Sequence, residues 1–226
     1  MRRMPRHLFF DLDGTLTDPA VGIVACFQHA IRALSGPVLP DADLNRFIGP
    51  PLVDSFREIL ATEDSDVIGS AVRHYRERFS SRGLFENEVY AGIPDALADL
   101  RESGFEMWVV TSKPQVYADR ILAHFGLRDR FTAVYGAELS GERSGKKELL
   151  AYVLEQERIC PSDACMIGDR RHDMEGAKAH PGLVALGVLW GYGTRGELDA
   201  AGADDLVERV EQLPATVRRM MGGHGN

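Results

Sequence analysis

Residues 9–16 read FFDLDGTL and form the strongest feature of the sequence. The apolar run that ends at Asp11 is typical of a buried strand. In an extended backbone Asp11 and Asp13 point to the same side, and Gly14 then permits a sharp turn. Two carboxylates held this close repel each other. A protein tolerates such a pair where a cation neutralises the two groups or where they take part in a reaction, such as attack on a phosphoryl group. The alternative is a strand-ending turn, in which Asp and Gly are common.

The rest of the chain alternates between two patterns. Short apolar runs predict strands at residues 7–10, 105–110, 133–135, 164–167, 184–188 and 206–207. Apolar residues at helical spacing predict helices at residues 94–102, 114–125, 147–158 and 173–180. This alternation indicates an α/β fold, a Rossmann-like doubly wound parallel sheet with helices on both faces. Ligands of such sheets bind at the carboxyl ends of the strands.

One stretch of the chain breaks this alternation. Between residues 17 and 86 the apolar residues follow helical spacing, and no strand pattern lies among them. Four of these residues recur at steps of four: Val67, Ala71, Tyr75 and Phe79. We therefore expect an α-helical domain at residues 17–86, inserted into an α/β core formed by residues 1–16 and 87–226.

Two later strand ends also carry polar residues. Thr111 and Ser112 offer hydroxyl and backbone N–H groups that suit a phosphate oxygen, although Ser112 could instead be the N-cap of the next helix. Asp169 follows another strand, and Asp173 lies four residues further on. Carboxylates that converge at one sheet edge match the oxygen ligands of Mg²⁺. Asp173 alone could also be an acid that interacts favourably with a helix N-terminus.

Lys146 and Lys147 stand where a helix is predicted to begin. A lysine at this position opposes the helix dipole, so a nearby phosphate and aspartate would explain it. The alternative is a solvated pair on the surface.

These motifs, at residues 9–16, 110–113, 146 and 167–173, resemble in order the motif set of the haloacid dehalogenase superfamily of phosphohydrolases. The inserted helical domain resembles the α-helical cap of the phosphoglycolate phosphatase-like branch. The stretch FIGPPL at residues 47–52 is similar to members described as phosphoglycolate phosphatases or 5′-nucleotidases.

The resemblance implies a Mg²⁺-dependent phosphatase that hydrolyses a small phosphate monoester. Asp11 would form an aspartyl-phosphate, and Asp13 would be the general acid and base. Lys146 would neutralise the phosphate and orient Asp11; we prefer it to Lys147 because the pattern Lys-x-Glu-Leu-Leu fits the family in that register.

The resemblance also implies ligands for the metal and the substrate. The phosphate group would be held by Thr111, Ser112 and Lys113, with Thr111 also acting in catalysis. Mg²⁺ would be held by Asp11, the backbone carbonyl of Asp13 and Asp169, with Asp173 adjusting that site. A loop of the cap would read the rest of the substrate through Ile48, Gly49 and Pro50.

Composition excludes several other classes of protein. A net charge of −8 argues against nucleic acid or an anionic membrane as a partner. The basic start of the chain is interrupted at Asp11, which does not fit a signal peptide, and no apolar stretch approaches the roughly 20 residues of a membrane span. Three cysteines without a C-x-x-C motif argue against a disulfide scaffold and against a zinc site. We expect a cytoplasmic protein, monomeric or homodimeric.

Rival functions fit the sequence less well. Residues 141–146 place three residues between glycines where a P-loop needs four, and no G-x-S-x-G elbow is present. A phosphomutase is the nearest alternative, because the same site could return the phosphoryl group to a sugar hydroxyl. A non-catalytic phosphate-binding regulatory protein is a more distant one.

Overall fold

The structure is a computed structural model that describes residues 6–222. The described residues form two compact units: one is built from the residues up to Thr17 together with those from Val89 onward, and the other from Asp18–Glu88. The chain passes between the units within β2 (Thr17–Asp18) and β3 (Glu88–Val89), which pair with each other.

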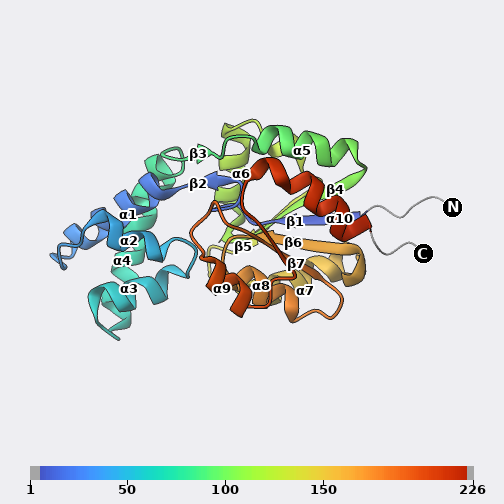
Figure 1. The fold of residues 1–226 in the computed structure, drawn as a ribbon. Coiled ribbons are helices and arrows are strands. Elements are labelled where there is room, and N and C mark those ends of the chain that lie inside the picture. The colour runs from blue at the N-terminus through green and yellow to red at the C-terminus, as the bar shows by residue number, and fades with distance from the viewer. Residues whose placement is uncertain (1–5, 223–226) are drawn as a thin grey trace. The chain divides into compact units, whose positions relative to one another are not determined.

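The first unit is built on a six-stranded parallel sheet in the order β5-β4-β1-β6-β7-β8 (Figure 1). Its strands are β1 (Arg6–Phe10), β4 (Phe105–Pro114), β5 (Val134–Ala137), β6 (Ala164–Gly168), β7 (Val184–Val188) and β8 (Asp205–Val207). Each lies where an apolar run predicted a strand, which confirms the α/β fold with a parallel sheet.

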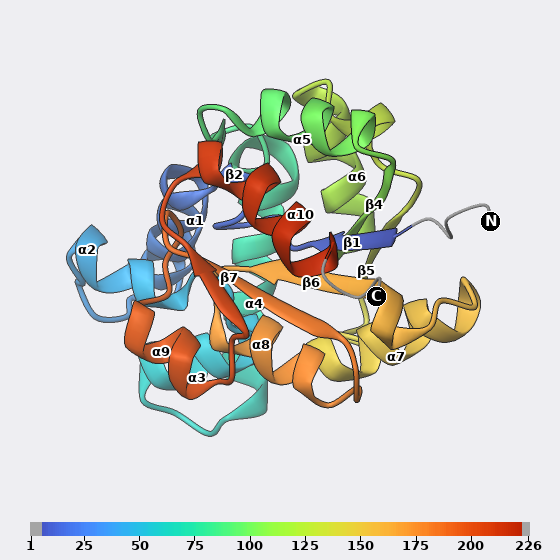
Figure 2. The ribbon, with the colours of Figure 1, turned by 45° about the vertical axis from the view of Figure 1, so that its right-hand side comes forward.

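Helices cover both faces of this sheet (Figures 1 and 2). One face carries α5 (Ile93–Glu102), α6 (Gln115–His124) and α10 (Leu213–Gly222), and the other carries α7 (Lys146–Gln156), α8 (Arg171–Lys178) and α9 (Arg195–Ala200). We did not predict α9 or α10. Helix α9 contains Gly196 and has only six residues, which are too few to show a helical period. Short 3₁₀ turns lie at Arg128–Arg130, Pro161–Asp163 and Val210–Gln212.

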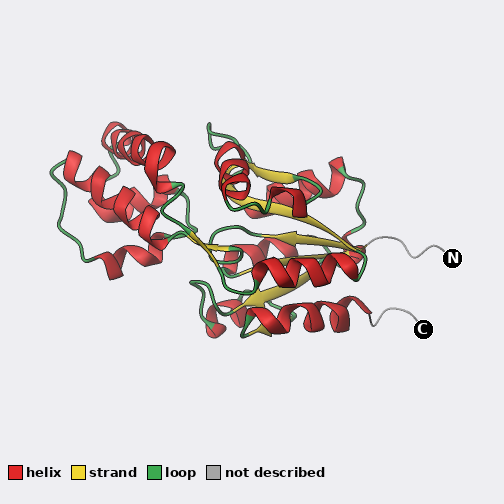
Figure 3. Ribbon diagram, turned by 90° about the horizontal axis from the view of Figure 1, so that it is seen from above, coloured by secondary structure: helices red, strands yellow, loops and turns green. Residues whose placement is uncertain are grey.

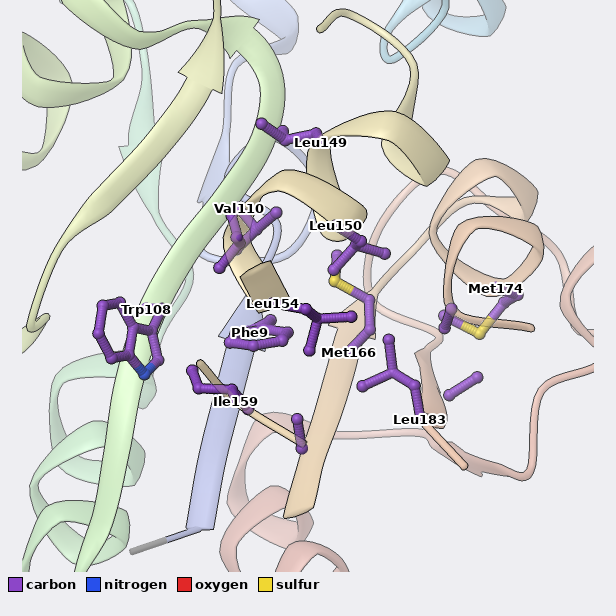
Figure 4. Packing of buried hydrophobic residues seen from close by; sticks show 14 of the residues in the cluster. Phe9, Trp108, Val110, Leu149, Leu150, Leu154, Ile159, Met166, Met174 and Leu183 are labelled. Atoms are coloured by element: carbon purple, nitrogen blue, oxygen red, sulfur yellow. The ribbon is translucent and has the colours of Figure 1, made fainter. Parts of the chain in front are cut away.

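The centre of the core lies around β1. Leu8, Phe9 and Phe10 are all fully buried, since helices cover both sides of the strand, and this is why the strand reads as a continuous apolar run. Phe9 is in register with Trp108 of β4 and Met166 of β6, and the three belong to the cluster under α7 (Figure 4).

The order of the strands makes β1 a switch point. The chain passes through α5 and α6 to reach β4 and β5 on one side of β1, and through α7, α8 and α9 to reach β6, β7 and β8 on the other. Ligands of open α/β sheets bind outside the carboxyl ends of the strands at such a point, here between β1 and β6.

The second unit is helical (Figure 3). It contains α1 (Ala20–Ala33), α2 (Asp41–Leu44), α3 (Leu52–Leu60) and α4 (Ser65–Arg78), with a 3₁₀ turn at Asn45–Phe47 and a π-helical turn at Phe79–Gly83. Phe27 of α1 packs against Phe56 and Tyr75, with ring centroids 5.2 and 5.0 Å away. Of the four apolar residues at steps of four, Ala71, Tyr75 and Phe79 are buried. Val67 is exposed, and its neighbour Ile68 is buried instead. Among residues 6–222, no helix is both long and apolar enough to cross a membrane.

Candidate active site

The two aspartates after β1 lie at the carboxyl edge of the sheet. The Asp11 N–H donates to the Ile167 carbonyl at 2.9 Å, so the pairing of β1 with β6 extends past the strand. The next turn needs Gly14, which has a φ of +79°. A Cβ at Gly14 would lie 2.2 Å from a carboxylate oxygen of Asp169, so a larger residue would clash with that side chain.

Lys146 reaches this edge from the first turn of α7. Its ammonium nitrogen lies 3.1 Å from Oδ1 of Asp11 and 2.7 Å from Oδ1 of Asp173. It also donates to the Val110 carbonyl at 2.9 Å. Lys146 is buried and Lys147 is exposed, so only Lys146 has its side chain among the aspartates.

Asp169 and Asp173 complete the acidic cluster. Asp169, fully buried after β6, accepts hydrogen bonds from Thr15 Oγ1 at 3.3 Å and from the Tyr192 N–H at 2.8 Å. Asp173, also buried, accepts the Arg170 N–H at 3.1 Å in the first turn of α8. Asp173 therefore accepts a hydrogen bond at the start of α8, as predicted for an acid at a helix N-terminus, and also faces Lys146.

The carboxylates of Asp11, Asp169 and Asp173 offer oxygens that lie within 4.8 Å of one another. Burial, reinforced by the charges of Asp173 and Asp11, raises the pKa of Asp169 well above its usual range. Burial also raises the pKa of Asp173 to about 6, although Lys146 opposes this shift. Buried carboxylates that repel one another, with only oxygen donors, fit a hard cation such as Mg²⁺.

The side chain of Asp13 pairs with Lys113 and not with Lys146. The Lys113 ammonium donates to both of its carboxylate oxygens, at 2.7 and 2.5 Å. Burial raises the pKa of Asp13, and Lys113 opposes the rise. A largely buried carboxyl with a raised pKa is suited to proton transfer. Lys113, predicted to bind phosphate, thus lies against the predicted acid and base.

Thr111 and Ser112 lie in the last part of β4. Thr111 is buried, and its hydroxyl accepts the Lys113 N–H at 3.3 Å. Helix α6 begins after Pro114 with no side-chain cap, so the alternative prediction of Ser112 as its N-cap is wrong. The pairing of β4 with β5 is irregular between Thr111 and Pro114, which alters the direction of side chains at this strand end.

Ile48, Gly49 and Pro50 belong to the helical unit. They form the bend between the 3₁₀ turn at Asn45–Phe47 and α3, where Gly49 has a φ of +105°. Ile48 is buried and Gly49 is exposed. The predicted contact of this loop with substrate stays a prediction.

A segment after β7, which we did not predict as part of the site, supports the acidic cluster. Besides the Tyr192 N–H, the indole of Trp190 donates to the Thr15 carbonyl at 3.0 Å. Glu197 of α9 accepts the Arg171 N–H at 2.9 Å and the Arg170 Nε at 3.0 Å. Glycines such as Gly191 and Gly193 are common in turns, but no sequence signal shows that this turn folds back onto the loop after β6.

Comparisons with known proteins agree on one family. The sequence model of the haloacid dehalogenase-like hydrolases matches residues 8–184. A 5′-nucleotidase from Pseudomonas aeruginosa is 44% identical over 195 residues, covering 86% of this chain and 87% of that protein. The tyrosine-protein kinase PtkA from Mycobacterium tuberculosis is 42% identical over 196 residues, covering 86% of this chain and 66% of that protein.

A solved structure is also similar throughout. The crystal structure of a predicted phosphatase from Clostridium acetobutylicum has a TM-score of 0.90 and 39% identity, covering 95% of this chain and 99% of that one.

Proposed function

This chain belongs to the haloacid dehalogenase-like hydrolase family, and we propose that it is a Mg²⁺-dependent phosphatase that works through an aspartyl-phosphate at Asp11. The family and the phosphatase class that the motifs implied are confirmed by the comparisons. The observation that supports the mechanism best is the buried ammonium of Lys146 between Asp11 and Asp173. It places a positive charge beside the carboxylate that would attack phosphorus.

The residues of the acidic cluster fit a magnesium ion. Asp11, the backbone carbonyl of Asp13 and Asp169 would hold it, and Asp173 would adjust that set. When bound, Mg²⁺ would neutralise charge on the phosphate oxygens and on the carboxylates around them.

In the first step, an oxygen of Asp11 attacks phosphorus and the bond to the ester oxygen breaks. Lys146 orients Asp11 and neutralises the phosphate, while the Thr111 hydroxyl and the Ser112 N–H hold its oxygens. Asp13 gives its proton to the leaving oxygen. The raised pKa of Asp13 supports this role, because more of the carboxyl is protonated near neutral pH than usual.

In the second step, water attacks the aspartyl-phosphate. The ionised carboxylate of Asp13 takes a proton from this water, and the bond between phosphorus and Asp11 breaks. Inorganic phosphate leaves, and both aspartates return to their starting states. Two displacements replace one harder reaction.

The helical unit would act as the cap of this site. We assign residues 17–86 to the cap and residues 1–16 and 87–226 to the core. Closure of such a lid excludes bulk water and completes the site. The loop at Ile48, Gly49 and Pro50 would select the substrate.

The substrate is a small phosphate monoester. The relative described as a 5′-nucleotidase favours nucleoside monophosphates, with phosphoglycolate and sugar phosphates as alternatives. We expect the protein to act in the cytoplasm, as a monomer or a homodimer.

A panel of these esters, assayed with Mg²⁺ for release of inorganic phosphate, tests the proposal. Asp11→Asn should lower turnover at least roughly 10³-fold while leaving the circular dichroism spectrum unchanged. Excess EDTA should abolish activity, and Mg²⁺ should restore it. Undiminished hydrolysis of p-nitrophenyl phosphate by Asp11→Asn would refute the mechanism.

A second candidate differs only in the acceptor of the phosphoryl group. The similarity to PtkA favours transfer to a tyrosine hydroxyl, and a mutase would transfer the group to a sugar hydroxyl. Labelled phosphate would then appear on protein or sugar instead of in solution. We favour water as the acceptor, because this chain covers 87% of the 5′-nucleotidase and 99% of the predicted phosphatase but 66% of PtkA.

A further inference from the structure

Three metal-ligating side chains gather on the helical unit, outside the site described above. They are His29 of α1 and His74 and Glu77 of α4, and each offers an atom within 4.8 Å of those of the other two. The helices α1 and α4 pack side by side along much of their length. The cluster therefore joins two helices that are separated by more than thirty residues of sequence.

The helix geometry places these groups on facing surfaces. His74 and Glu77 are three residues apart and share one face of α4, with Nδ1 of His74 3.8 Å from Oε2 of Glu77. The ring of His29 meets that of His74 edge to face, with centroids 6.3 Å apart and planes at 75°. Both histidines are half-buried and Glu77 is exposed. None of these contacts is a hydrogen bond. The three side chains therefore lie close together without hydrogen bonds between them.

We propose that His29, His74 and Glu77 form a site for a divalent late transition metal, with Zn²⁺ as its natural occupant. Two imidazoles and one carboxylate are a donor set that zinc uses in proteins, with a fourth position left to water. Mg²⁺ prefers oxygen ligands and would stay at the aspartates of the core unit.

Closing the site requires only small side-chain movements. Around tetrahedral zinc, with metal–nitrogen bonds of about 2.0–2.1 Å, ligand atoms lie about 3.3 Å apart. The three groups must therefore approach one another from their present separation of up to 4.8 Å. The Glu77 side chain is 76% exposed and can rotate freely toward the histidines. The bound ion would tie α1 to α4 and stabilise the helical unit, because the unfolded chain does not bring these ligands together.

Zinc binding to the full-length protein tests the proposal. Calorimetry with Zn²⁺, in a buffer that holds excess Mg²⁺ to occupy the core site, should show one equivalent bound. His74→Gln should weaken this binding at least roughly tenfold, as even changes around metal ligands cost that much. His29→Phe removes the imidazole nitrogens but retains an aromatic ring, so it separates loss of a ligand from loss of packing. His124→Ala, an exposed histidine on α6, is the matched control and should bind zinc like the unaltered protein.

Pulsed electron paramagnetic resonance with Cu²⁺ supplies a direct readout of the ligands. The remote nitrogen of a bound imidazole should appear in the spectrum and should be lost in the variant that combines His29→Phe with His74→Gln. Zinc should also raise the melting temperature of the unaltered protein and not that of the double variant. The proposal would be overturned if the unaltered protein and the double variant bound zinc with equal affinity, or if the imidazole signal survived in the double variant.

Discussion

The ammonium nitrogen of Lys146 lies 2.7 Å from Oδ1 of Asp173, and both side chains are almost fully buried. The charge of Asp11 and then that of Asp173 raise the pKa of Lys146 against the effect of burial, so the lysine stays protonated. Lys146→Met should lower kcat roughly 10²–10³-fold, since one electrostatic contact to the reacting group is lost. Lys147→Met should leave kcat unchanged, because Lys147 is exposed. Steady-state kinetics of the pair checks this, and equal losses would contradict the assignment.

Asp169→Asn should separate activity from stability. Without metal, the buried Asp169 carboxylate is repelled by Asp173 and Asp11, so its removal should stabilise the fold. The amide can still accept the Tyr192 N–H and can donate to the Thr15 hydroxyl. A gain of about 1 kcal/mol would raise the melting temperature by roughly 2–4 °C.

The same variant should lose activity and its response to metal. Release of inorganic phosphate tests the loss of activity. Melting curves in EDTA and in Mg²⁺ test the response to metal: Mg²⁺ should raise the melting temperature of the unaltered protein and leave that of Asp169→Asn unchanged. An Asp169→Asn protein that Mg²⁺ stabilises normally would argue against the metal assignment.

Lys113→Met should affect the acid and base more than substrate binding. Lys113 lowers the pKa of Asp13 against the effect of burial, so its removal should raise that pKa further. Since Asp13 must also act as a carboxylate in the second step, the acidic limb of the pH profile of kcat should move to higher pH. At fixed neutral pH we expect kcat to fall about tenfold, less than the roughly 10²–10⁴-fold that general acid–base catalysis contributes as a whole, because Asp13 itself is retained. A rise in KM with an unshifted profile would instead assign Lys113 to phosphate binding.

Glu197→Ala should weaken metal activation without touching the reacting groups. Although burial opposes its ionisation, the Arg171 N–H and then the Arg170 guanidinium lower the pKa of Glu197. The carboxylate thereby holds the loop that carries Asp169 and Asp173. We expect the Mg²⁺ concentration for half-activation to rise roughly 10-fold, with kcat at saturating Mg²⁺ nearly normal. Glu197→Gln keeps an acceptor for the Arg171 N–H and should restore most of the affinity; a purely structural role would lower the melting temperature and leave metal activation alone.

Changes in the loop at residues 48–50 should alter substrate preference. Ile48→Ala and Pro50→Ala should change the ratio of kcat/KM between nucleoside monophosphates and phosphoglycolate more than they change hydrolysis of p-nitrophenyl phosphate. Variation of a pocket by a few methyl groups is worth about 1–3 kcal/mol, or roughly 10–200-fold in such ratios. A uniform effect across the panel would remove this loop from substrate recognition.

The sequence alone determined the sheet and the convergence of its acids. A buried strand followed by DLDG, and a later strand followed by Asp169, place carboxylates at one edge, because parallel strands end at the same side of a sheet. These inferences depend only on local pattern and on the direction of neighbouring strands.

Other contacts of the site depend on tertiary packing and cannot be inferred from a local sequence pattern. Lys146 and Lys147 both open α7, where adjacent residues differ by about 100° around the helix. The sequence pattern favoured Lys146, and the structure buries its side chain and exposes that of Lys147. The contact between Lys113 and Asp13 joins residues 100 positions apart through adjacent strands and an irregular strand end. The hydrogen bond from the Arg171 N–H to Glu197 likewise depends on a turn that folds back across the sheet edge. The Lys113–Asp13 and Glu197–Arg171 contacts are long-range contacts set by packing, so a single sequence carries no periodic signal for them.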